Sequence, residues 1–160
     1  MKTKRLIFPL IALMVMACSG NKQTKESLTQ GDISGADSVA HPDILGQWYI
    51  ENIFFNDSTY TRPSEQCPGI RQYILFESDG DYSVMTNCNH GAGKYTLSNT
   101  EISFRDAAWT ELACDNMATE EAIRRILPLL RSVEIENDSV MRINSDSEPY
   151  LILLKAKEIK

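Results

Sequence analysis

Four side chains in the middle of the chain carry atoms suited to nucleophilic or metal chemistry: Cys67, Cys88, His90 and Cys114. Cys88 and His90 lie two residues apart, so in an extended strand they would share a face, where an imidazole can activate a thiol. A catalytic Cys–His pair is usually assembled from distant parts of a chain and needs a third group to orient the base. No such partner is identifiable, so a Cys88/His90 hydrolase is a subordinate alternative and we predict no catalytic residue.

The same four residues are a poor zinc site. Structural zinc is typically held by ligands in closely spaced pairs, whereas only Cys88 and His90 are neighbours here. The sequence after residue 42 has a single histidine and no Gly-rich phosphate loop. We therefore predict neither a metal ion nor a cofactor.

The segments around these residues carry signals for antiparallel strands. Aromatic and β-branched residues are concentrated in short runs that turn-forming residues separate, and Asp79-Gly80 is a strong hairpin signal. The continuous apolar run 151–154 predicts a central strand buried on both faces. Residues 56–69, with Pro63, Pro68 and Gly69, read as a loop. The predicted strands are 44–55, 72–77, 82–86, 94–98, 102–105, 133–136, 140–143 and 150–155.

One helix is predicted from about Thr119 to Arg131. Apolar residues recur there at the i, i+3, i+4, i+7 spacing of one helical face, namely Ile123, Ile126, Leu127 and Leu130. Thr119 is the expected N-cap, and acidic residues in the first turn complement the helix dipole. Pro128 conflicts with a continuous helix, so we expect a kink or an end near it.

Seven or eight short strands and one helix predict an α+β fold, mainly an antiparallel β roll or partly closed barrel. Such a barrel has either a filled core or a ligand cavity. The residues that decide between them should be Ile74, Phe76, Tyr95 and Phe104. Tyr49, Tyr82 and Trp109 are candidates for exposed aromatic residues that line a groove, although a packing role is favoured.

Composition and charge set the broad class. The chain has 160 residues, of which 42% are hydrophobic and 24% charged, as in one ordinary globular domain. Its formal net charge is −6. Without residues 1–17 it has 13 basic and 22 acidic residues, a net charge of −9. A nucleic-acid partner is not expected, because phosphate binding needs clustered Lys and Arg.

The first residues predict export. Residues 1–5 are cationic, and residues 6–16 form an apolar run too short to span about 30 Å of hydrocarbon as a helix. Val15-Met16-Ala17-Cys18 resembles the bacterial lipobox, although Met16 is larger than usual. We therefore predict a signal peptide at 1–17 and lipid attachment at Cys18; an ordinary signal peptide with a chance cysteine is the alternative. The residue after Cys18 is Ser19. An Asp at this position would resemble an inner-membrane retention signal, so Ser19 favours the outer membrane.

Residues 18–42 are predicted to be the acylated cysteine and a flexible tether, because the segment is polar and poor in large apolar side chains. The folded domain should occupy residues 43–160. A lipid anchor and a long tether would hold that domain near the membrane, facing the periplasm.

Four motifs, in order, resemble the META domain family, also called HslJ-like. They are Ile44-Leu45-Gly46-Gln47-Trp48, Asn87-Cys88-Asn89, Gly93-Lys94-Tyr95 and Thr110-Glu111-Leu112-Ala113-Cys114. The order and spacing agree over about residues 43–157. Asn87 stands where the family usually has Gly, and Leu112 stands where it usually has Met.

The resemblance implies an envelope lipoprotein with a stress-related or binding role, and no catalytic mechanism. Cys88 and Cys114 occupy motif positions that flank one strand pair, so we expect a disulfide between them, as is common in an oxidising envelope. Pairing of either with Cys67 stays open. The predicted function is a non-enzymatic, membrane-anchored module that binds a protein or a small apolar ligand. A lipocalin-like carrier is the alternative.

Overall fold

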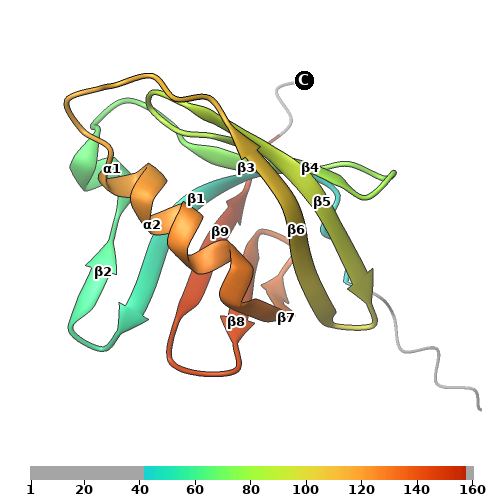
Figure 1. Cartoon of the computed structure of the whole chain (residues 1–160). Helices are drawn as coiled ribbons and strands as arrows, with labels where there is room; N and C mark the ends of the chain where they lie inside the picture. The colour runs from blue at the N-terminus through green and yellow to red at the C-terminus, as the bar shows by residue number, and fades with distance from the viewer. Residues whose placement is uncertain (1–41, 158–160) are drawn as a thin grey trace, which may run out of the picture. The chain divides into compact units, whose positions relative to one another are not determined.

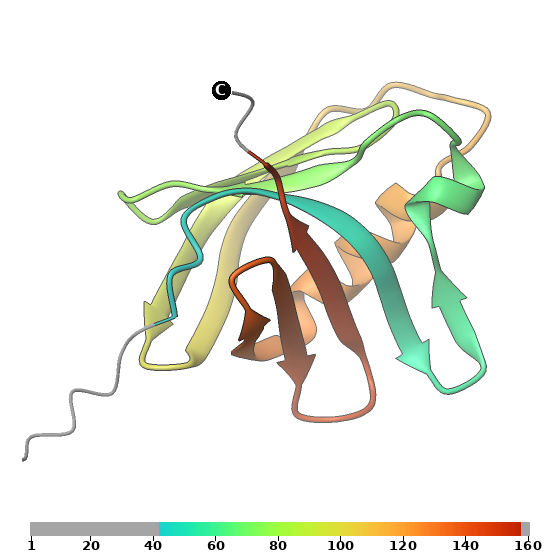
Figure 2. The same ribbon diagram turned by 180° about the vertical axis from the view of Figure 1, so that it is seen from behind.

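A computed structural model of the chain describes residues 42–157, which form one antiparallel sheet closed into a barrel (Figures 1 and 2). The barrel strands run in the order β1-β3-β4-β5-β6-β7-β8-β9, and β9 pairs with β1 to close the ring. Within this part of the chain the elements are β1 (Gly46–Asn56), β2 (Thr59–Thr61), α1 (Pro63–Gln66), β3 (Tyr73–Phe76), β4 (Asp81–Met85), β5 (His90–Ser98), β6 (Glu101–Trp109), α2 (Ala118–Ile126), the 3-10 turn η1 (Leu127–Leu129), β7 (Leu130–Asn137), β8 (Val140–Ser145) and β9 (Tyr150–Lys155).

Strand β1 connects three neighbours. Its first half pairs with β3, most of its length pairs with β9, and its end pairs with β2, which lies outside the ring. The pairing with β9 shifts register between Ile50 and Asn52. A register shift of this kind bends a strand and increases its local twist. The bend lets one long strand pair with β3 at one end and β2 at the other (Figure 2).

Side chains fill the interior of the barrel. Inward-facing residues alternate with outward-facing ones along the strands, as the pleat requires, and helix α2 adds Ile123 and Ile126, both 0% exposed. Phe76 packs against Tyr95 edge to face at 5.2 Å and against Phe104 at 6.2 Å. The largest buried side chains include Trp48, Phe76, Ile44, Ile53, Ile74, Leu130, Met141, Ile143, Leu151 and Leu153. Of the two possibilities that the sequence left open, the structure shows a filled core.

The predicted fold class is confirmed, and the ring of strands is closed, although β6 and β7 pair only through Glu101 and Ser132. Strand β9 has the predicted bounds, Tyr150–Lys155. Its predicted burial on both faces is wrong, because only Leu151 and Leu153 are buried while Ile152 and Leu154 are half-buried on the outside. The predicted loop 56–69 contains β2 and the four-residue helix α1, which begins at Pro63.

The predicted helix exists but ends earlier than expected. Helix α2 ends at Ile126, and Pro128 lies in the following 3-10 turn. Pro128 has no backbone N–H to donate to the preceding helical turn, which favours an end of the α-helix here. Arg131 therefore belongs to β7. Thr119 is not the N-cap, which is Met117; it is buried inside the helix, where its hydroxyl accepts a hydrogen bond from the Gln72 side chain.

Candidate functional site

A disulfide joins Cys88 to Cys114, with 6.4 Å between their Cα atoms. The sulfur of Cys88 is therefore not available as a thiolate, and the Cys88/His90 pair cannot form a nucleophile and base in this state. His90 lies at the start of β5 and is exposed. Cys67 is a free, half-buried thiol. These residues form no reactive constellation.

The disulfide lies beside a buried polar network centred on Asn89, which is 0% exposed. Its amide nitrogen donates to the Leu112 carbonyl and to the Glu120 carboxylate, each at 2.9 Å. Its amide oxygen accepts from the Thr110 hydroxyl at 2.7 Å and the Leu112 N–H at 2.8 Å. Thr86 closes the turn by donating to the Asn89 carbonyl. All four side-chain hydrogen-bonding positions of Asn89 are thus satisfied.

Arg124 extends this network toward the surface. Its guanidinium pairs with the buried Glu120 carboxylate at 2.9 Å and with Glu111 at 3.0 Å. It also lies over the Trp109 ring at 4.8 Å. The ring in turn covers Gly91, where a Cβ atom would lie 2.6 Å from the indole. The network holds the 110–114 segment and α2 against the barrel, which is a structural role rather than a catalytic one.

The described residues offer one acidic cluster of the kind that could hold a metal ion, formed by Glu77, Asp79 and Asp81 at the β3–β4 turn. Asp81 forms an ion pair with Lys94 across the β4–β5 pair. The hydrogen bond from Lys94 to Asp81 raises the pKa of the Lys94 ammonium. Because the Lys94 ammonium already pairs with one carboxylate of the cluster, we do not assign the cluster as a metal site.

Tyr82 has the packing role that the sequence favoured over an exposed groove role. Its side chain is 2% exposed and packs edge to face on Phe104 at 5.2 Å. Burial, with a smaller contribution from Asp106, raises the pKa of the Tyr82 phenol. Trp109 is half-buried beneath Arg124. Tyr49 lines two surface hollows, whereas Trp109 and Tyr82 each line one other.

The outer wall of the barrel carries a row of apolar side chains. Val140 pairs with Leu154, Leu154 with Tyr49, Tyr49 with Tyr73, and Tyr73 with Met85, so five adjacent strands contribute one residue each. All five are half-buried. The solvated face of an antiparallel sheet is normally polar. We call these five residues the outer apolar row.

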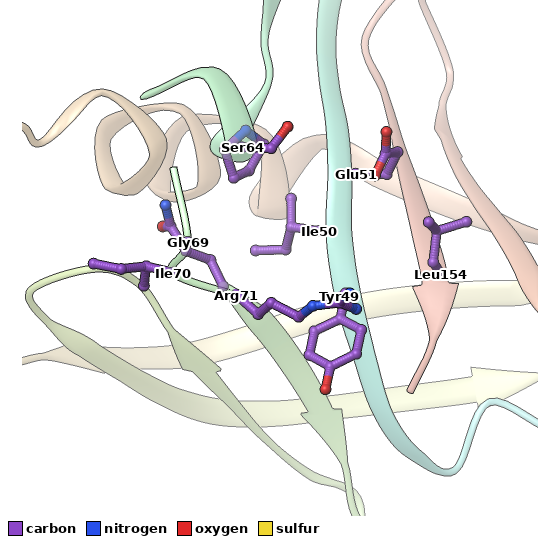
Figure 3. A pocket seen from close by; sticks show the side chains of 10 residues that line it. Tyr49, Ile50, Glu51, Ser64, Gly69, Ile70, Arg71 and Leu154 are labelled. Carbon is purple, nitrogen blue, oxygen red and sulfur yellow. The ribbon is translucent and has the colours of Figure 1, made fainter. Parts of the chain in front are cut away.

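Two hollows flank Tyr49 in the middle of this row. The first, shown in Figure 3, has a volume of about 390 Å³ and lies where β3 leaves β1; Glu51, Ser64, Ile70 and Arg71 are among its lining residues. We call it the Glu51 cleft. In Figure 3 the Arg71 side chain extends toward Tyr49, and its guanidinium lies 4.7 Å from the centre of the Tyr49 ring.

The second hollow, the basic groove, has a volume of about 580 Å³ and lies on the other side of the Tyr49–Arg71 pair. Its lining residues are Tyr49, Arg71, Ser139, Val140, Leu154, Lys155 and Lys157. Three of the seven are basic and none is acidic. The sequence reasoning missed Arg71, Lys155 and Lys157, because they are distant in the chain and only barrel closure brings them together.

A sequence model of the META domain matches residues 44–158. The chain belongs to the META domain family. The match covers the whole barrel, from the start of β1 to beyond β9, and includes the four motifs identified in the sequence. A search of curated proteins found no match.

Two solved structures resemble the META domain of this chain. One, an NMR structure of a protein from Burkholderia xenovorans, is 20% identical, with a TM-score of 0.59 over 86% of this chain and 99% of that chain. The other, a crystal structure of a DUF4847 family protein from Bacteroides vulgatus, is 11% identical, with a TM-score of 0.50 over 71% of this chain and 94% of that chain. At these identities the likeness concerns the fold alone.

The predicted signal peptide and the lipid attachment at Cys18 lie outside the described residues, as does nearly all of the tether. Within residues 42–157, the helices are too short or too polar to span a bilayer. The predicted anchor therefore stays a prediction.

Proposed function

We propose that this protein is an envelope lipoprotein, anchored at Cys18 to the outer membrane and facing the periplasm, whose META domain is a non-enzymatic binding module. The outer apolar row is the observation that carries the binding role. Five adjacent strands expose apolar surface at one level of the barrel wall. Contiguous exposed apolar surface of this kind commonly marks an interaction site.

The filled core favours an external site over an internal one. A lipocalin-like carrier needs an interior cavity, whereas Ile74 and Phe76 are at most 1% exposed and Phe76 packs on Tyr95 and Phe104. The outer row is open to a partner without any rearrangement of that core. The tether predicted at 18–42 would let the module reach partners near the membrane.

The anchor is tested on the native protein by detergent partitioning and intact mass. We expect a mature chain that begins at Cys18, carries lipid mass and enters the detergent phase, while a Cys18→Ala variant stays in the aqueous phase. A native product without lipid mass contradicts the anchor.

The binding role is tested by native mass spectrometry of the protein purified from its own envelope. We expect a retained component that is lost from a Tyr73→Ser/Met85→Ser variant but kept by a Thr96→Ala variant, which changes an exposed position of β5 away from the row. Equal retention by both variants contradicts the row as the site. Turnover of thioester or peptide substrates that Cys88→Ser abolishes without unfolding contradicts the non-enzymatic role.

A further inference from the structure

The basic groove has the chemistry of a site for an amphiphile. We propose that it binds a single small molecule with an anionic head and an apolar body, of the class of a medium-chain fatty acid. The inference rests on the binding role proposed above and names a ligand class for one end of the outer apolar row. The volume of about 580 Å³ falls within the roughly 300–1,000 Å³ of small-molecule sites.

The floor of the groove is continuous apolar surface. Val140, Leu154 and Tyr49 come from β8, β9 and β1, and each is the direct cross-strand neighbour of the next. Cross-strand neighbours on one face have Cβ atoms about 5 Å apart. No polar side chain therefore fits between these three residues. An alkyl chain laid across the strands would cover all three and remove apolar surface from water.

The rim of the groove is cationic in an acidic protein. Arg71, Lys155 and Lys157 line it, although the whole chain has a net charge of −6. None of the ion pairs formed within residues 42–157 involves these three residues. Arg71 and Lys157 therefore have no carboxylate within ion-pair distance among these residues, and an anionic head would be attracted to them.

One of the three cations, Arg71, is held beside the apolar floor. The Arg71 guanidinium lies over the Tyr49 ring, 4.7 Å from its centre. Lys155 pairs with the buried Trp48, so its side chain lies on the sheet face opposite to Tyr49 and Leu154. Its ammonium donates to the Leu45 carbonyl at 2.7 Å and lies 4.5 Å from the centre of the Trp48 ring, so it is not counted as a donor to the head. Fixed donors lose less side-chain entropy when they bind a carboxylate or phosphate.

The charge distribution also selects between the two hollows beside Tyr49. The Glu51 cleft shares Tyr49, Arg71 and Leu154 with the basic groove, but a carboxylate lines it. An anionic head in that cleft would face Glu51 at short range. The basic groove has no acidic lining residue, so the head is expected there, near Arg71 and Lys157.

Isothermal titration calorimetry of the full chain, carrying Cys18→Ala so that no detergent is needed, tests the proposal. Decanoate below its micelle concentration is the probe; decanol lacks the charge and acetate lacks the apolar body. We expect saturable one-site binding of decanoate, binding of decanol that is weaker by about fivefold or more, and no measurable binding of acetate. Equal affinities for decanoate and decanol overturn the proposal.

Matched variants locate the site. Arg71→Gln should weaken decanoate binding by about fivefold or more, whereas Arg142→Gln, which removes another arginine stacked on a tyrosine, should change it by less than about twofold. Leu154→Asn should weaken binding, and Ile152→Asn, at another half-buried outer position of β9, should not. Arg71 is exposed, so the Arg71→Gln variant is expected to fold. If Leu154→Asn fails to fold, Arg71→Gln decides the result.

Two outcomes distinguish failure of the proposed ligand class from failure of the proposed binding role of the outer apolar row. If decanoate does not bind while vesicles with anionic lipid cosediment with the protein, the single-molecule ligand is wrong. If decanoate does not bind and the native component is still lost from the Tyr73→Ser/Met85→Ser variant, the ligand class is wrong but the binding role of the outer apolar row stands.

Discussion

The side-chain amide of Asn89 donates a hydrogen bond to the Glu120 carboxylate at 2.9 Å, and so links the turn after β4 to helix α2 across 31 residues of chain. Both side chains are at most 2% exposed. A buried carboxylate without partners is costly; Glu120 has Asn89 on one oxygen and Arg124 on the other. The Asn-Cys-Asn motif therefore serves the packing of the helix as well as the disulfide.

Replacing Asn89 by Asp should destabilise the protein in a pH-dependent way. At pH 7 the variant places two carboxylates against each other and loses both amide donors, so we expect a loss of about 3 kcal/mol or more. Mutual repulsion raises the pKa of the pair in the folded state above its unfolded value. The folded state then binds more protons, and the difference from wild type should shrink as pH falls toward about 4.5.

Urea unfolding of wild type and Asn89→Asp at pH 7 and pH 4.5 measures this difference. Asn99→Asp is the control, because it adds the same charge at an exposed turn position. A pH-independent loss in Asn89→Asp would mean that the Glu120 contact is unimportant.

Loss of the disulfide should cost about 3 to 4 kcal/mol, the chain-entropy value for a loop of this length; the bonded cysteines are 26 residues apart. Cys114→Ser is the informative variant, since Cys114 is exposed and its side chain supports little packing. Cys67→Ser should change the free energy of unfolding by less than about 1 kcal/mol. Denaturant unfolding measures both, and peptide mapping without reduction must find the 88–114 bridge; a bridge to Cys67 contradicts the assignment.

Gly93→Ala should be strongly destabilising, by about 2 kcal/mol or more, because the new methyl group overpacks the barrel. A Cβ atom there would lie 2.6 Å from the Arg105 carbonyl oxygen and 2.8 Å from the Tyr82 ring. Gly93 does not have a positive φ, so space alone requires glycine. Thermal unfolding measures the loss, and Ala92→Ser, at the exposed neighbouring position, should leave the midpoint nearly unchanged. Equal midpoints for the two variants would falsify the packing argument.

Alkaline pH should destabilise the barrel through Tyr82 and Tyr95. Burial raises the pKa of each phenol above 10.0 in the folded state, so the folded protein retains protons that the unfolded chain releases. Stability is unaffected below about pH 10 and falls as pH rises from there toward the folded pKa values. Absorbance at 295 nm should show late ionisation that is reduced in Tyr82→Phe, and an unchanged titration in that variant contradicts the assignment.

Local patterns in the sequence were sufficient for much of the fold. The alternating strands, the end of the helix near Pro128 and the Cys88–Cys114 pairing all depend on residues close in the chain or on family motifs. The four-residue helix at Pro63 was missed because a Pro-rich segment so short carries no periodicity. Burial on both faces was predicted for Leu151–Leu154 because an apolar outer wall gives the same run of residues as a doubly covered strand.

The candidate site was beyond reach of such patterns. Tyr49 was singled out as an aromatic residue, but its neighbours Arg71, Val140 and Lys155 lie 22, 91 and 106 residues further along the chain. They meet only because β9 returns to β1 and β3 lies on the other side. The apolar character of the outer row likewise depends on the register of four strand pairings, which no local signal specifies.

The closure of the barrel by its first and last strands also constrains how the chain folds. The Lys155 ammonium reaches the Leu45 carbonyl across 110 residues, and the Ala156 N–H donates to the Gln47 carbonyl at 2.9 Å. Pairings this distant close slowly, because the whole intervening chain must be ordered first. Strand β1 therefore lacks its β9 partner until the end of the chain is available. A chain that stops before residue 150 has no β9, so the edges of both β1 and β8 stay unpaired. Such edges pair with other chains, so premature termination should yield aggregates rather than a smaller folded domain.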